Sequence, residues 1–183
     1  MLEQSHLVKK LSQNEIQDLI SERDLLNDLW EPHSLPTALR HGKTIYLQQI
    51  DEAEIIKLNL KLSLSRLDKC PKTKIILQKI AGNGLISRCY WHKLMPGDKI
   101  ERHNDRDLIF VMNGVLAHRY QIYLDSDPRF VLELDGKIVP TKPWENTVID
   151  FALEKMHFYH NTSDKPWTFL VFDVLHNNLS PNI

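Results

Sequence analysis

The spacing of apolar residues changes near Gly84, and this change constrains the fold more than any other feature of the sequence. Before Gly84, apolar residues recur about every four positions, which is typical of helices with one buried face. After Gly84, apolar and polar residues alternate, which is typical of half-buried strands. The expected strands are 86–95, 116–124, 130–134, 137–139, 144–151, 156–160 and 168–174. Many short strands with turn signals between them favour a barrel or a jelly roll.

The part of the chain before Gly84 is predicted to be mostly helical. Ser12 and Glu15 form a capping box ahead of an apolar helix face. Residues 51–67 repeat apolar side chains at helical spacing, residues 73–81 form a shorter helix ended by glycine, and residues 44–48 form a short strand. Because helices precede strands along the chain, we expect the helices to pack on one face of the β unit.

The length and charge of the chain limit its class. At 183 residues it is expected to be a single domain, with a helical part (1–83) packing on the sheet and a β core (84–176). The net charge of −1 provides no basic field for nucleic acid or an anionic membrane. No apolar run approaches the roughly 20 residues of a membrane span. Neither nucleic acid nor a membrane is therefore a leading partner.

The cysteine count and the start of the chain bear on its compartment. Cys70 and Cys89 are the only cysteines, which is too few for a disulfide framework. The first residues lack the basic start and apolar stretch of a signal peptide. These features predict an intracellular, cytoplasmic protein.

His103 and Asp105, with His157 much later in the sequence, form a candidate metal site. In an extended segment, residues two apart point to the same side, so His103 and Asp105 can reach one ion. Two imidazoles and one carboxylate are typical of non-haem Fe(II) oxygenases, in which positions remain open for a cosubstrate and O2. The alternative for the first pair is a weak surface contact, and His160 competes with His157 for the ligand role.

Five segments of the second half resemble the aspartyl/asparaginyl β-hydroxylase family, which includes free proline hydroxylases. The segments are the Pro-Gly turn and histidine of 94–105, the arginine strand 119–124, the strand 144–150, the His-x3-Asn and Ser-Asp segment 157–164, and the closing strand 169–174. The resemblance implies a double-stranded β-helix, cupin-like fold and an Fe(II)/2-oxoglutarate-dependent hydroxylase that uses O2. It also implies that His103, Asp105 and His157 are the metal ligands.

The chain departs from this family where the cosubstrate should bind. Trp167 replaces the arginine expected ten residues after the second histidine, His92 replaces an assisting serine, and Gln121 stands where the family often has histidine. A tryptophan cannot pair with a carboxylate, although its indole N–H can donate one hydrogen bond. His92, Lys165 or Arg119 could supply the missing charge.

Arg119 is the candidate anchor that its strand constrains most. An arginine pointing into a β-barrel is costly unless it meets an anion, such as the carboxylate of a cosubstrate or substrate. The alternative is an outward-facing arginine in a salt bridge. Gln121 points the same way as Arg119 and is expected to be its hydrogen-bonding neighbour.

Two functions are compatible with these features. The first is a dioxygenase that uses Fe(II), 2-oxoglutarate and O2 to hydroxylate an amino acid, free or in a small peptide or natural product. The second, favoured by the changes at Trp167 and His92, is a non-catalytic β-helix module that binds a metal, a small acid or a partner protein.

Overall fold

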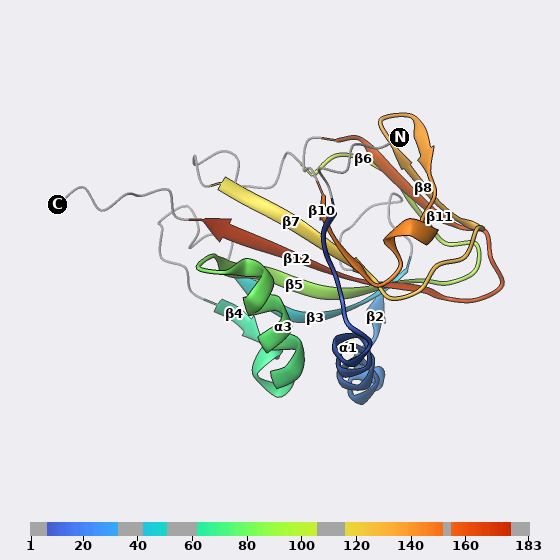
Figure 1. The fold of residues 1–183 in the computed structure, drawn as a ribbon. Helices are drawn as coiled ribbons and strands as arrows, with labels where there is room; N and C mark the ends of the chain where they lie inside the picture. Colours follow the sequence, from blue (N-terminus) through green and yellow to red (C-terminus); the bar gives the residue numbers. More distant parts are fainter. Residues whose placement is uncertain (1–6, 33–41, 51–61, 106–115, 152–154, 177–183) are drawn as a thin grey trace.

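The structure is a computed structural model that describes residues 7–32, 42–50, 62–105, 116–151 and 155–176. Within these ranges the chain is mainly β, with two α-helices and two antiparallel sheets (Figure 1). Neither helix is long and apolar enough to cross a lipid bilayer.

The larger sheet joins strands from both halves of the sequence. Among the described residues its order is β1-β10-β7-β12-β5-β3-β2, with β4 also paired to β3. Its strands are β1 (Leu7–Lys10), β2 (Glu31–Pro32), β3 (Lys43–Ile50), β4 (Leu62–Ser65), β5 (Leu85–Leu94), β7 (Leu116–Tyr123), β10 (Thr147–Phe151) and β12 (Trp167–His176). The sheet therefore contains strands that precede Gly84 as well as strands that follow it.

The smaller sheet has the order β6-β11-β8-β9 in the described part of the chain. Its strands are β6 (Lys99–His103), β8 (Phe130–Leu134), β9 (Lys137–Val139) and β11 (His157–Asn161). Asp135 and Gly136 join β8 to β9 with positive φ angles of 47° and 78°. Two consecutive positive φ values are typical of a two-residue hairpin turn, so the expected turn is confirmed.

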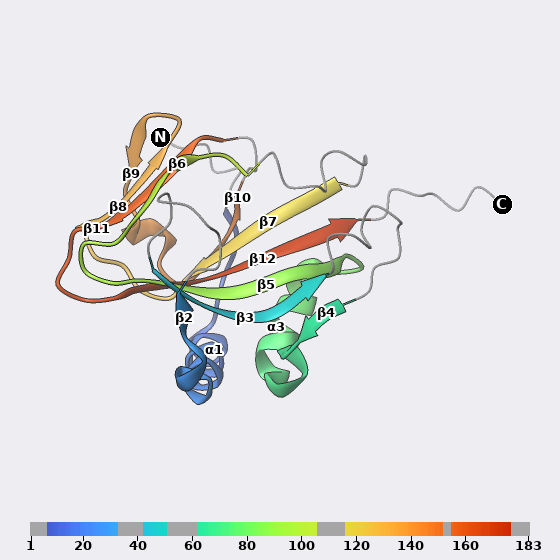
Figure 2. The same ribbon diagram turned by 180° about the vertical axis from the view of Figure 1, so that it is seen from behind.

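The helices α1 (Gln13–Leu25) and α3 (Pro71–Ala81) pack on the larger sheet. Ser12 and Glu15 form the expected capping box at the start of α1. The buried carboxylate of Glu22 in α1 accepts the backbone N–H groups of Lys72 and Thr73 at 2.9 and 2.7 Å, and so caps α3. Figures 1 and 2 show both helices on the same side of the larger sheet, opposite the smaller sheet.

Strand β12 shows how the larger sheet supplies two cores. Leu170 and Phe172 belong to the core shared with the helices. Phe169 and Val171 belong to the core shared with the smaller sheet. Successive residues of a strand point to opposite faces. Polar residues an even number of positions from Phe169 in β12 must therefore lie between the two sheets.

The first part of the chain contains more strand than its sequence pattern predicts. Residues 51–61 lie outside the described residues, but Leu62–Ser65 is strand β4, so the expected helix 51–67 does not reach its predicted end. The Leu-Ser-Leu-Ser sequence alternates, and it pairs with the edge of β3, which overrides the helical spacing of the leucines. Within the described residues, short 3₁₀ helices cover Asn27–Leu29, Leu67–Lys69 and Lys142–Trp144.

Candidate metal centre

Three potential metal ligands converge between the two sheets. His103 ends β6, His157 begins β11, and the two residues are direct partners in the antiparallel pairing. Asp105 follows β6 in a bend and is only 5% exposed. One potential ligand atom from each residue lies within 4.8 Å of the others. The sequence-predicted set is therefore brought together from two strands and one turn.

Backbone hydrogen bonds orient both histidine rings. The Nδ1 atoms of His103 and His157 lie 2.7 Å from the carbonyl of Glu101 and 3.0 Å from that of Lys155. A carbonyl oxygen can only accept, so each Nδ1 carries a proton, and in the neutral form of each ring Nε2 keeps its lone pair. The Nε2 atoms lie 3.7 and 3.5 Å from the oxygens of Asp105. This donor set of two imidazole nitrogens and a carboxylate fits a divalent metal ion.

A second carboxylate holds the arginine that contacts Asp105. Nε and Nη2 of Arg119 donate to the two oxygens of Asp173 at 2.7 and 2.8 Å, while Nη1 contacts Asp105. Arg119 and Asp173 are partners across β7 and β12 and are only 3% and 2% exposed. Burial alone lowers the pKa of Arg119, but the charges of Asp105 and Asp173 raise it well above its usual value. The guanidinium therefore links Asp105 to the sheet.

The anions that Arg119 meets belong to the chain itself. From the sequence, a cosubstrate or substrate carboxylate was the expected partner of an inward arginine. Asp173 occupies the two-pronged face of the guanidinium instead. Asp173 is the site residue that sequence reasoning missed; the available signal was a lone carboxylate within the apolar strand Trp167–His176.

The remaining cosubstrate candidates divide into two groups. His92 and Gln121 line the same small cavity as the three candidate ligands and Arg119. Trp167 does not: it is fully buried and stacks on Phe130 with ring centroids 4.7 Å apart. Lys165 does not line this cavity either; its Nζ lies 3.8 Å from Asp127, and its side chain is 47% exposed.

The polar end of this cavity is organised by Gln121. Its Oε1 accepts hydrogen bonds from the hydroxyls of Tyr123 and Tyr159, the latter at 2.9 Å. Both phenols therefore face the carbonyl end of the amide, and Nε2 is left as the donor toward the cavity. The cavity volume is about 20 Å³, which holds about one water molecule.

His160 and Asn161, also in β11, have different surroundings from His157. His160 is three residues from His157, so it projects from the opposite face of the strand and is outside the ligand cluster. Asn161 donates to the carbonyls of Leu94 and Lys165 at 2.9 and 2.8 Å and accepts from Ser163. Asn161 therefore fixes the turn that follows β11.

Comparison with known proteins identifies relatives of the fold. No family model matches the sequence, and no curated protein matches it. AviO1 from Streptomyces viridochromogenes Tue57 matches with a TM-score of 0.61 at 14% identity, over 97% of this chain and 90% of AviO1. An oxidoreductase of the 2OG-Fe(II) oxygenase family from Burkholderia pseudomallei matches with a TM-score of 0.55 at 16% identity, over 86% and 79%. A prolyl-4-hydroxylase from Pseudomonas putida matches with a TM-score of 0.55 at 16% identity, over 91% and 88%.

These comparisons show which known structures share the fold of this chain. The structural neighbours include 2-oxoglutarate/Fe(II) oxygenases, among them a prolyl hydroxylase. The narrower resemblance to the aspartyl/asparaginyl β-hydroxylase family has no support from sequence comparison.

Proposed function

We propose that the protein is an Fe(II)/2-oxoglutarate-dependent dioxygenase that hydroxylates an amino acid, free or within a small peptide or natural product. The observation that carries this proposal is the convergence of His103 with the buried side chains of Asp105 and His157. The similarity of the fold to 2-oxoglutarate/Fe(II) oxygenases supports it, and so does the arrangement of two packed sheets, which we interpret as a double-stranded β-helix of the jelly-roll, cupin-like type.

The chain contributes the presentation of the metal ligands. His103 and His157 direct Nε2 to one point because their Nδ1–H groups are held by carbonyls. Asp105 is kept in place by Arg119, which is itself fixed by Asp173. Bound Fe(II) and 2-oxoglutarate supply the oxidising power, since O2 converts 2-oxoglutarate to succinate and CO2 and the substrate C–H bond to an alcohol.

Holding the cosubstrate requires groups other than Arg119. Its guanidinium already pairs with two carboxylates, and Trp167 and Lys165 do not line the cavity. We infer that Gln121 and His92 orient 2-oxoglutarate by hydrogen bonds. The cavity has to widen to admit it, because about 20 Å³ is far below the volume of a typical small-molecule site.

A metal-binding module without catalysis is the second candidate function. The narrow cavity favours this second function. Arg119 is the one lysine or arginine side chain among the described residues that line the cavity, and Asp105 and Asp173 already pair with it. In that case the protein binds a divalent ion and has no affinity for 2-oxoglutarate.

Anaerobic absorption spectroscopy separates the two functions. The dioxygenase develops a weak visible charge-transfer band with Fe(II) and 2-oxoglutarate and then releases succinate in air when an amino-acid substrate is present. The His103→Ala and Asp105→Ala variants should lose most of the Fe(II) affinity measured by calorimetry, whereas the matched variant His160→Ala should retain it. Metal binding without the band would establish the second function, and undiminished affinity in Asp105→Ala would refute the ligand set.

A further inference from the structure

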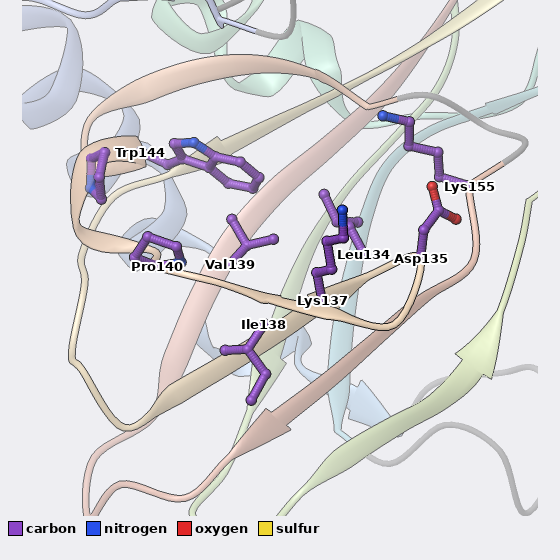
Figure 3. Close-up of a pocket in the computed structure, with 9 residues that line it drawn as sticks. Leu134, Asp135, Lys137, Ile138, Val139, Pro140, Trp144 and Lys155 are labelled. Atoms are coloured by element: carbon purple, nitrogen blue, oxygen red, sulfur yellow. The ribbon is translucent and has the colours of Figure 1, made fainter. Parts of the chain in front are cut away.

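A larger cavity lies beside the candidate metal centre, under the hairpin formed by β8 and β9. It has a volume of about 600 Å³, within the range of small-molecule sites. Its apolar wall contains Leu134, Val139 and Trp144, which are 7%, 2% and 8% exposed. The rim carries Lys137 and Lys155 (Figure 3).

Strand register connects this cavity to the metal centre. His103 pairs with His157, His157 pairs with Leu134, and Leu134 pairs with Lys137. Directly opposed residues in adjacent strands point to the same face, so these four side chains form one row across the inner face of the smaller sheet. Adjacent strands lie about 4.8 Å apart, which places Lys137 about 10 Å from His157 along the row.

The alternation of β9 directs its lysine toward the cavity. Figure 3 shows Lys137 and Val139 on one side of the β9 backbone and Ile138 on the other, where it is 73% exposed. The backbone of Lys137 pairs with Leu134, and its ammonium makes no ion pair or hydrogen bond with the described part of the chain. Its ammonium is therefore available to an anion that lies against Val139.

The charges of the rim favour an anionic ligand. Among the described lining residues, the charged side chains are Lys137, Lys155 and Asp135, and Lys155 also interacts elsewhere within the protein. One oxygen of Asp135 accepts the backbone N–H of Met156 at 3.1 Å, so this carboxylate is partly engaged by the start of β11. A carboxylate ligand gains attraction at the rim, while an apolar body gains burial on the wall.

We propose that this cavity binds the substrate, and that the substrate is a carboxylic acid with an apolar body, such as an apolar amino acid. The assignment rests on the proposed oxygenase function, because it is the adjacent His157 that makes the cavity a substrate site. The carboxylate binds at Lys137, and the apolar body lies along Leu134, Val139 and Trp144 toward the metal centre.

Three small probes test the ligand class on the metal-free protein. We expect 3-phenylpropionate to bind saturably in NMR titrations with a dissociation constant of about millimolar order. The neutral 3-phenylpropanamide and the short propionate should each bind at least about fivefold more weakly, because each lacks one of the two recognised features. Equal affinity for the amide, or no saturable binding of 3-phenylpropionate, would overturn the proposal.

Matched lysine variants test the location. Lys137→Ala should weaken 3-phenylpropionate binding at least about fivefold, and Lys137→Arg should restore most of it. Lys79→Ala, which removes an exposed lysine from α3, should leave binding unchanged. Unchanged binding in Lys137→Ala would show that the carboxylate is held elsewhere and overturn the assignment.

Paramagnetic broadening separates this proposal from the proposed function. Mn(II) bound at the candidate centre should broaden the aromatic protons of bound 3-phenylpropionate, and His103→Ala should abolish the effect. Probe binding with Mn(II) bound but without broadening overturns the substrate role of the cavity. Failure of Mn(II) to bind overturns the metal centre, and with it the substrate role, while the metal-free titration still decides whether the cavity takes apolar acids.

Discussion

Replacement of Asp173 by asparagine should destabilise the fold and weaken the metal centre together. Both oxygens of Asp173 accept from Arg119, at 2.7 and 2.8 Å, and both residues are almost fully buried. Removing one member of a buried ion pair costs about 3–5 kcal/mol, because the other charge is left uncompensated. Arg119 keeps its contact with Asp105, so we expect the lower value, about 3 kcal/mol.

Thermal and urea unfolding measure this loss directly. For a chain of this size, about 3 kcal/mol corresponds to a fall in Tm of roughly 6–12 °C. Metal affinity should fall about tenfold or more in the same variant, because Asp105 loses the fixed arginine that orients it. The matched control is Asp164→Asn, which removes an exposed partner of Arg129 and should leave Tm and metal affinity unchanged.

A double variant distinguishes an uncompensated charge from a loss of packing. Arg119→Met combined with Asp173→Leu keeps side-chain volume but leaves the buried Asp105 without its guanidinium partner, so it should be less stable than Asp173→Asn, in which Arg119 still pairs with Asp105. A Tm for Asp173→Asn within error of the wild type would refute the reasoning. Destabilisation with unchanged metal affinity would confine Asp173 to a structural role.

Three further predictions follow from particular contacts. Burial raises the pKa of the Asp125 carboxyl to about 6. Between pH 4 and 6 the folded state therefore keeps this carboxyl protonated while the unfolded state releases the proton, so the fold should gain stability as the pH falls through this window. The urea midpoint of Asp125→Asn should lack this pH-dependent contribution. Ser12→Ala should cost about 1 kcal/mol in urea unfolding, because α1 loses its capping box with Glu15. Deletion of residues 1–50 should give insoluble or non-cooperative protein, since β3 pairs with β5 inside the larger sheet; a soluble fragment with a cooperative melt would show that the β core is autonomous.

Features encoded by neighbouring residues were predictable from the sequence. The capping box at Ser12, the hairpin turn at Asp135 and the alternation of β8 each depend on a few consecutive positions. The pair His103 and Asp105 was predictable for the same reason, since two residues in an extended segment share a face. Assigning His157 rather than His160 required the resemblance in addition.

Features set by distant contacts were not predictable in the same way. The sequence Leu62–Ser65 fits both a helical stripe and an alternating strand, and its pairing with the edge of β3 decides between them. The N-terminal strand Leu7–Lys10 is likewise stabilised by β10, from the other end of the chain. The partnership of Arg119 and Asp173 depends on the register of β7 and β12, which no local pattern specifies.

The buried cluster around Asp105 also sets an order in which charged ligands can enter. One guanidinium, Arg119, and two carboxylates, Asp105 and Asp173, give the cluster a formal charge of −1 while both imidazoles are neutral. A dianion such as 2-oxoglutarate is repelled by this cluster and attracted once a divalent cation has changed its charge to +1. Under the proposed function, the metal-free protein should therefore not bind 2-oxoglutarate, whereas the metal-loaded protein should bind it.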